Sequence, residues 1–361
     1  MTTRLCRLAA AAAFATAATL GAAALRADDS ITGQNSFTIT KLVSDLPGAA
    51  FTDPNLKNPW GVAFSPAGSP FWVSDNATGL STLYDGDGSI QSLVVTVPGA
   101  SGQGAPTGIV WNPSSSFLVP KTTTPAVFIF AGEDGTISVW GGGNSAKIAA
   151  DNSQSGAVYK GLAFGVNPNG DFLYATNFNS GKIDVFDHNY QPATTPGGFQ
   201  DPNLPAGYAP FGIENISGDL FVSYAVQNAE KHDDVPGQGH GIINVFDTSG
   251  NLLRRFASHG VLNSPWGMMR AGYNSGALSG LILIGNFGDG KINAYSTNGV
   301  FVSRMLGTNN RPLTIDGLWK LTPGGGAKSS PDTIYFTAGL NGETDGLFGT
   351  ITPASGDMAG N

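Results

Sequence analysis

One short element, Asn58-Pro59-Trp60-Gly61-Val62-Ala63-Phe64, joins a turn, a glycine and an apolar strand, and related elements recur along the chain. The later copies are centred on five further glycines: Gly108, Gly161, Gly212, Gly267 and Gly317. Successive glycines of this set are separated by 47, 53, 51, 55 and 50 residues. A period near 50 residues is typical of one four-stranded blade of a β-propeller. We expect the repeated glycine to start each blade in a turn that needs a positive φ.

Each copy is followed by short strands rich in β-branched and aromatic residues, such as Phe71–Asp75 and Leu220–Tyr224. The sixth copy lacks a fourth strand, because the chain ends soon after Thr352. The alternating segment Phe37–Ser44 precedes the first copy and can fill that gap, which would hide an exposed sheet edge. We therefore predict an all-β, six-bladed β-propeller over residues 37–352, with an N-terminal strand completing the last blade. A solenoid is the alternative, but it would show shorter periods and atypical end repeats.

Composition supports this fold class and limits the partners. The chain of 361 residues has 51 glycines and 22 prolines, while charged residues make up only 12%. Such a composition argues against helical bundles and favours short strands joined by tight turns. The formal net charge is −8. Nucleic acid phosphates and anionic membranes would repel such a chain, so we expect no nucleic acid partner.

Residues 1–27 are typical of a secretory signal peptide. Arg4 and Arg7 precede the uncharged, alanine-rich run from Leu8 to Leu25, and small residues follow. A membrane anchor is the alternative, but the run is short and only weakly apolar, so we expect no membrane span. We predict a secreted or periplasmic protein, with residues 28–36 as a short linker and residues 353–361 as a disordered tail. Cys6 is the only cysteine and precedes the run, so the mature chain would contain no disulfide.

The residue before each repeated glycine should lie around the central channel, because the first strand of a blade lines that channel. These six candidate ligand-binding residues are Trp60, Thr107, Lys160, Phe211, Trp266 and Asp316. Aromatic faces can stack on sugar rings or hold cations. The alternative is that the bulky rings simply fill the channel.

The loops after the second strands should share the same face of the propeller. Their carboxylate and amide groups are candidate ligands for Ca²⁺ or another divalent metal: Asp75, Glu133, Asn177, Asn286, Asp289 and Glu343. The alternative is that these Asn and Asp residues only cap local backbone in turns.

A long insertion between Tyr224 and Gly241 should lie on that face as well. It contains His232, Asp233 and Asp234, which are candidate catalytic residues. His232 with a neighbouring carboxylate can act as a general base, and His232 with His240 can join a metal site. The alternative is a solvated surface loop.

Several motifs carry a resemblance to known families. The strings Val73-Ser74-Asp75-Asn76 and Gly241-Ile242-Ile243-Asn244-Val245-Phe246-Asp247 resemble the blades of NHL-type propellers. Other strings, including Glu230-Lys231-His232-Asp233-Asp234-Val235 and Gly285-Asn286-Phe287-Gly288-Asp289-Gly290, resemble an uncharacterised family of secreted bacterial six-bladed propellers, some with PEP-CTERM sorting tails. That resemblance implies an exported propeller and brings no activity with it; this chain lacks the tail.

A weaker resemblance is to gluconolactonase-like propellers, and it implies a divalent metal at the channel mouth. Those enzymes begin their first blade with a metal-binding Glu, whereas this chain has Pro59-Trp60-Gly61 at that place. The departure counts against the same catalytic site.

Three functional hypotheses follow. The first is an exported propeller that binds a small molecule, a saccharide or a protein on its loop-rich channel face, since no catalytic motif is evident. The second is a lactonase-like, divalent-metal-dependent hydrolase or lyase with its site at the channel mouth. The third is a structural protein of an envelope or matrix.

Overall fold

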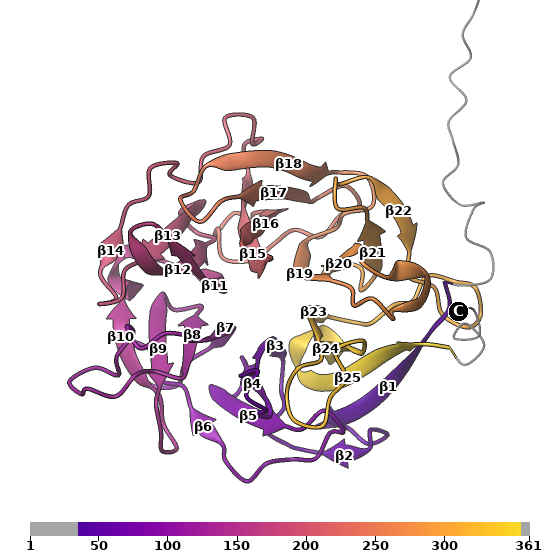
Figure 1. Ribbon diagram of the computed structural model, residues 1–361, viewed down its shortest axis with the longest axis horizontal. Helices are drawn as coiled ribbons and strands as arrows, with labels where there is room; N and C mark the ends of the chain where they lie inside the picture. Colours follow the sequence, from indigo (N-terminus) through magenta and orange to yellow (C-terminus); the bar gives the residue numbers. More distant parts are fainter. Residues whose placement is uncertain (1–34, 355–361) are drawn as a thin grey trace, which may run out of the picture.

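A computed structural model of the chain describes residues 35–354. The predicted signal peptide, nearly all of the predicted linker and most of the predicted tail lie outside these residues. Six sheets are arranged radially around a central axis, and the chain passes through them in order around the ring (Figure 1). The sequence prediction of an all-β, six-bladed propeller is confirmed.

Blades 1 to 3 follow one another from Pro59 onward. Their strands are β3 (Pro59–Ala63), β4 (Phe71–Asp75), β5 (Leu80–Tyr84) and β6 (Val95–Thr96); β7 (Pro106–Trp111), β8 (Phe128–Gly132), β9 (Thr136–Trp140) and β10 (Lys147–Asp151); and β11 (Tyr159–Asn167), β12 (Gly170–Asn177), β13 (Lys182–Phe186) and β14 (Pro192–Ala193). A 3₁₀ turn, Ser153–Ser155, links blades 2 and 3.

Blades 4 and 5 have the same pattern, and blade 6 is closed by the start of the chain. Their strands are β15 (Tyr208–Ile216), β16 (Asp219–Val226), β17 (Ile242–Phe246) and β18 (Leu252–Ser258); β19 (Pro265–Arg270), β20 (Ile282–Asn286), β21 (Ile292–Tyr295) and β22 (Phe301–Arg304); and β23 (Leu318–Pro323), β24 (Ile334–Gly339) and β25 (Asp345–Pro353) with β1 (Phe37–Ser44) and β2 (Phe51–Thr52). The remaining elements are a 3₁₀ turn at Gly276–Leu278 and the short helix α1 (Leu340–Glu343).

Strand β1 pairs antiparallel with β25, from Phe37 opposite Pro353 to Ser44 opposite Leu347. The two ends of the described chain therefore meet in one sheet (Figure 1). This confirms the prediction that an N-terminal strand completes the last blade. Pairing of the ends closes the ring with backbone hydrogen bonds.

The core consists of apolar side chains packed between neighbouring blades. One such cluster contains Leu283 of blade 5 and Phe336 of blade 6, both fully buried. Another contains Phe71 of blade 1 and Phe348 of blade 6. Packing of neighbouring blades covers both faces of the sheets, which explains why second strands such as β4 and β20 are buried along their whole length.

Of the six predicted repeated glycines, only Gly317 has the expected positive φ, 60°, and the others serve a different purpose. Gly108, Gly212 and Gly267 are not among the glycines with positive φ. Instead, a Cβ atom on Gly212 would lie 2.3 Å from the Trp266 carbonyl oxygen, and one on Gly108 would lie 2.3 Å from the Leu162 nitrogen. The glycines allow the innermost strands of neighbouring blades to approach closely, which a side chain would prevent.

The same contacts correct the register of blade 6. A Cβ on Gly267 would meet the Trp319 oxygen and the Leu321 nitrogen, which flank Lys320. The pairing of β23 with β24 is also interrupted between Leu318 and Leu321, as that of β3 with β4 is interrupted between Pro59 and Val62. Lys320, and not Gly317, is therefore the sixth residue of the glycine series, and Trp319 takes the position predicted for Asp316.

Among residues 35–354, no helix is long and apolar enough to cross a membrane.

Candidate functional site

Six side chains face the axis at the start of the first strands, where a β-bulge interrupts the pairing in each blade. They are Trp60, Thr107, Lys160, Phe211, Trp266 and Trp319, and all are at most 5% exposed. Five of them are predicted ligand-binding residues. The sixth prediction, Asp316, is corrected by the register: its side chain is exposed, and its Oδ2 accepts a hydrogen bond from the Asn341 backbone N–H at 2.9 Å.

Aromatic rings fill the channel at this level. Trp319 lies between Trp60, at a centroid distance of 3.5 Å, and Phe287, at 3.9 Å, and both pairs are stacked. Trp266 meets Trp60 and Trp319 edge-on. Both faces of Trp319 are thus covered by other rings, so stacking of a sugar on this indole is excluded. The packing fits the channel-filling role that the sequence left open as an alternative.

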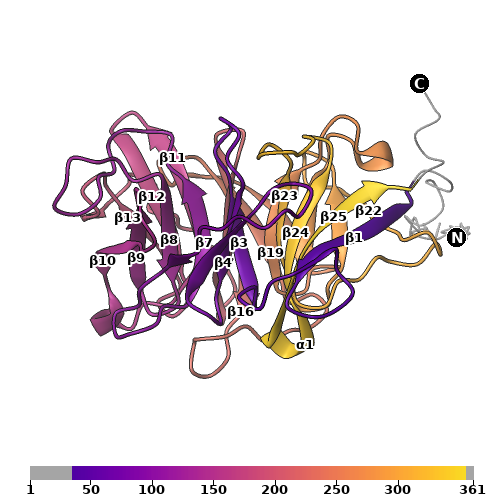
Figure 2. The same cartoon turned by 90° about the horizontal axis from the view of Figure 1, so that it is seen from below.

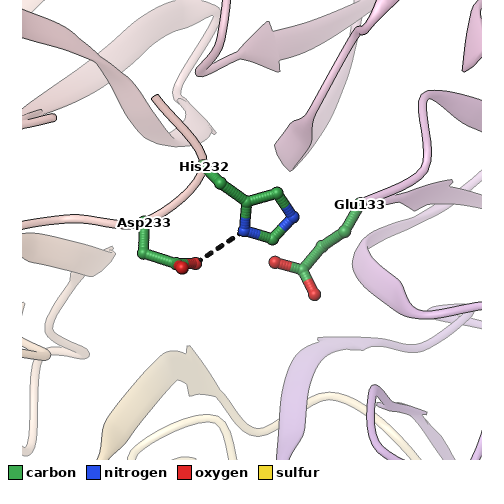
Figure 3. A group of neighbouring side chains, drawn as sticks. All are labelled: Glu133, His232 and Asp233. Atoms are coloured by element: carbon green, nitrogen blue, oxygen red, sulfur yellow. Dashed lines mark hydrogen bonds and ion pairs between the residues drawn. The ribbon is translucent and has the colours of Figure 1, made fainter. Parts of the chain in front are cut away.

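A cavity of about 420 Å³ lies on the loop-rich side of these rings. It is lined by residues of all six blades: Trp60, Glu133, Lys160, Phe211, His232, Asp233, Asp234, Pro236, Phe287, Trp319 and Glu343. We call it the axial pocket. The loop between β16 and β17 and helix α1 both protrude from the face on which it opens (Figure 2). Figure 3 shows Glu133, His232 and Asp233 converging from two different loops.

Lys160 is the charged centre of the axial pocket. Its side chain is only 2% exposed, and its Nζ forms ion pairs with Glu133 and, at 3.2 Å, with Asp233. Burial by itself lowers the pKa of Lys160, but the two carboxylates outweigh it and raise the pKa above the ordinary value. The ammonium group is therefore charged at neutral pH. Nζ also lies 5.2 Å from the centre of the Trp60 ring, within range of a cation–π contact.

The carboxylates of the pocket have divergent environments. Burial raises the pKa of Asp234, and its buried Oδ2 has no hydrogen-bond partner among the described residues. Burial also raises the pKa of Glu343, and the charge of Glu133 adds to this effect. Burial acts on Asp233 in the same direction, but Lys160 and His232 outweigh it and lower the pKa of that carboxyl. The pocket thus holds acids that titrate in different ranges, as sites of acid–base chemistry do.

Asn58 connects the aromatic floor to the acids. Its Oδ1 accepts a hydrogen bond from the Trp319 Nε1–H at 3.0 Å, and its Nδ2 donates to Glu343 Oε2 at 2.8 Å. Asn58 and Glu343 both have positive φ, 45° and 69°. Non-glycine residues in this region are strained, and such strain is concentrated at functional sites. The backbone therefore holds the Glu343 carboxylate in the pocket at a conformational cost.

His232 and Asp233 form a pair at the mouth of the pocket. His232 Nδ1 lies 2.9 Å from Asp233 Oδ1 (Figure 3). When Nδ1–H donates to the carboxylate, Nε2 keeps a lone pair, which a general base requires. His240, the other histidine of the insertion, does not line the pocket; its Nδ1 lies 2.9 Å from the Val235 oxygen.

Of the six predicted metal ligands, the structure brings two into the pocket, Glu133 and Glu343. Asn177 accepts a hydrogen bond from the Val158 N–H and holds its own turn. Asn286 donates to the Val261 oxygen and to Asp289, which also pairs with Lys291. Asp75 is fully buried within blade 1 and accepts from the Thr82 N–H. These four side chains form hydrogen bonds or ion pairs outside the pocket, which agrees with the alternative that such Asn and Asp residues stabilise local structure.

A group capable of holding a metal ion nevertheless exists in the described part of the chain. Glu133, His232 and Asp233 each offer one ligand atom, and these atoms lie within 4.8 Å of one another. Sequence reasoning named all three residues but placed them in separate sets. It missed Trp319 and Phe287 as pocket residues, although Trp319 follows Trp266 by 53 residues, which is one repeat length.

Comparison with known proteins supports the fold and gives three relatives at 31–35% identity, all uncharacterised proteins of Acanthamoeba polyphaga mimivirus. No model of a known protein family matches the chain. The uncharacterised protein R648 of Acanthamoeba polyphaga mimivirus is 35% identical over 334 residues, which cover 88% of this chain and 80% of R648. The motifs predict a secreted bacterial family, but this relative is viral.

Solved structures share only the fold with this chain. Virginiamycin B lyase from Staphylococcus aureus has a TM-score of 0.52 at 13% identity, covering 88% of this chain and 99% of the lyase. A gluconolactonase from Xanthomonas campestris has a TM-score of 0.50 at 11% identity, covering 83% of this chain and 87% of that protein. These comparisons confirm one part of the family prediction, the propeller architecture, which this chain shares with a lyase and a gluconolactonase.

Proposed function

We propose a function from the axial pocket of this chain, which belongs to the same protein family as the uncharacterised mimivirus protein R648. The protein binds a small organic molecule that carries hydroxyl or amine groups. The observation that carries this proposal is the convergence of Glu133, Asp233, Asp234 and Glu343 around Lys160 in one pocket. A volume of about 420 Å³ lies within the range of small-molecule sites, roughly 300–1,000 Å³.

Charge and ring packing narrow the ligand class. Four carboxylates face one lysine and one histidine, so the pocket favours neutral or cationic ligands over anionic ones. Because the indole faces of Trp60 and Trp319 are used in stacking, recognition rests on hydrogen bonds to the acids rather than on ring stacking. Polyols, monosaccharides and small amines are the chemistry that such a lining recognises.

The test is a thermal-shift screen of monosaccharides, polyols and small amines, followed by calorimetric titration of any molecule that stabilises the protein. We expect binding to be lost in the double variant Asp234→Asn, Glu343→Gln, since both acids line the pocket. Asp289→Asn is the matched control, because Asp289 lies in the loop between β20 and β21 outside the pocket. Binding that survives the double variant, or a screen without any ligand, would contradict the proposal.

A second candidate is a lactonase-like hydrolase or lyase, and the His232–Asp233 pair favours it. His232 would remove a proton through Nε2, and the Lys160 ammonium would stabilise negative charge that develops on a ligand oxygen. The protein should then hydrolyse sugar lactones or activated esters, and His232→Ala should abolish turnover. His240→Ala is the control in the same insertion. If His232→Ala is as active as His240→Ala, the His232–Asp233 pair is not the base.

Export remains a proposal that rests on residues 1–27 of the sequence. N-terminal sequencing of protein secreted by a bacterial host tests it, and a mature protein beginning near residue 28 is the expected result. Retention of the intact N-terminus in the cytoplasm would contradict it. A structural role in an envelope or matrix would instead require the protein to stay with that fraction after salt washing.

A further inference from the structure

The resemblance to lactonase-like propellers implies a divalent metal at the channel mouth, and the residues there allow a direct test of fit. Glu133, His232 and Asp233 are the described residues that could hold an ion. Two of these three, Glu133 and Asp233, are already paired with the same Lys160 ammonium group. The place between the two carboxylates is therefore taken by a cation that the chain itself supplies.

Lys160 is fixed in this position from several sides. Its side chain is 2% exposed, and Trp60 lies against the ammonium group. Its backbone carbonyl accepts a hydrogen bond from the Trp266 Nε1–H at 2.9 Å. A divalent ion bound by Glu133 and Asp233 would lie close to this ammonium group, and like charges in a buried setting repel strongly. The ion would have to displace a lysine whose side chain is buried and in contact with Trp60.

Two further donor atoms are engaged as well, whereas His232 Nε2 keeps its lone pair. Glu133 Oε2 accepts a hydrogen bond from Asn76 Nδ2 at 2.9 Å, and His232 Nδ1 contacts Asp233 at 2.9 Å. Hard cations such as Ca²⁺ take about six to eight oxygen ligands. Three of the four carboxylate oxygens of Glu133 and Asp233 are engaged by Lys160, Asn76 or His232, so this group offers fewer free oxygen atoms than a hard cation takes and does not fit a resident divalent metal.

We infer that Lys160 is the resident cation of the axial pocket and takes the place of a divalent metal between Glu133 and Asp233. The pocket therefore acts without a metal ion. Lys160 is a positioning residue for the two carboxylates and presents a fixed positive charge to ligand oxygen atoms. The inference rests on the proposed function only in assigning a ligand to the pocket. The exclusion of the metal rests on the ion pairs of Lys160 and on the contacts that engage the remaining donor atoms.

The experiment is a titration of the full chain with Mn²⁺, Ca²⁺ and Zn²⁺, each alone, followed by calorimetry and by the thermal unfolding temperature. The native protein should show no saturable binding. Lys160→Met removes the charge and keeps an unbranched side chain, and it should bind at least one of these ions roughly a hundredfold more tightly than the native protein. Adding Glu133→Gln to this variant should remove the gain.

The result that overturns the inference is one divalent ion bound per native chain, with binding lost in Glu133→Gln. Failure of Lys160→Met to gain affinity while remaining folded would also overturn it. If that variant does not fold, the native titration still decides, because it needs no substitution. The ligand screen described above, run with a chelator present, is independent of the metal titration. A screen without hits contradicts the proposed function, whereas the metal titration alone tests the role of Lys160.

Discussion

Replacement of Gly212 by alanine tests the claim that the blades are held at a distance that only glycine permits. The new Cβ would lie 2.3 Å from the Trp266 carbonyl oxygen of the next blade, and real Cβ contacts below 3.0 Å are essentially never found. The obstacle is backbone of β19, so no flexible side chain can move aside. The inner strands of blades 4 and 5 must separate, and the Trp266 ring moves with them.

The size of the effect follows from two opposing contributions. Overpacking of a rigid contact costs about 1–3 kcal/mol. Alanine returns about 0.4–1 kcal/mol by restricting the unfolded chain. The difference between the centres of these ranges puts the net loss for Gly212→Ala at about 1.3 kcal/mol. At Gly161 the nearest atoms lie 3.1 Å away, so the same substitution requires a shift of only a few tenths of an ångström. Gly161→Ala should therefore change stability by less than about 1 kcal/mol.

Equilibrium urea denaturation, followed by tryptophan fluorescence, measures both variants. With an m value of about 3 kcal/mol/M, the loss in Gly212→Ala corresponds to a midpoint lowered by roughly 0.4 M. The comparison is valid only if m is unchanged, because a changed m signals an altered unfolding reaction. Equal midpoints for the two variants would refute the argument, since the repeated glycine would then not be required by contact between blades.

Three further perturbations test the packing and the electrostatics. Trp266→Ala should lower the free energy of unfolding by about 3–5 kcal/mol, because the ring is 5% exposed within the aromatic cluster. The control Tyr273→Ala, at a residue that is 83% exposed, should change it by less than about 0.5 kcal/mol. Similar losses of stability in the two variants would contradict the channel-filling role. Thr337→Val should cost about 1–3 kcal/mol, since the Thr337 hydroxyl donates to the buried Trp60 carbonyl at 2.6 Å, while the exposed Thr123→Val serves as a control that should be neutral. Burial and the nearby Asp53 raise the pKa of Asp75 well above 3.8, so the folded protein binds more protons than the unfolded chain above about pH 4 and loses stability as pH rises. The stability of Asp75→Asn relative to the native protein should thus increase from about pH 4 to pH 8 in urea titrations, and a flat difference would refute the assignment.

The sequence was sufficient for the architecture because a propeller repeats one local pattern. The pattern at Trp60-Gly61 recurs at Trp266-Gly267, and its period predicts the number of blades. The missing fourth strand of the last copy and the alternation of Phe37–Ser44 predict the pairing of that segment with the last sheet. It failed in blade 6, where Gly317 offered a false match and Lys320 stands in the glycine position. Gly317 has the positive φ of a turn residue, 60°. The constraint on Gly108, Gly212 and Gly267 is contact with a different blade, which no local pattern encodes.

The site could be predicted in part, for a related reason. The repeat indicates which face carries the loops, so Glu133, Lys160 and Asp233 could each be named as candidates from their place in a blade. Which groups meet depends on side-chain direction around the ring. Asn177 and Asp289 contact Ser180 and Lys291 in their own loops instead. Most consequential is Lys160, because the position before the repeated glycine is otherwise Trp, Phe or Thr. One long basic side chain at that position reaches two carboxylates from different blades. It thereby changes a cluster that would attract a metal into one that already holds its cation.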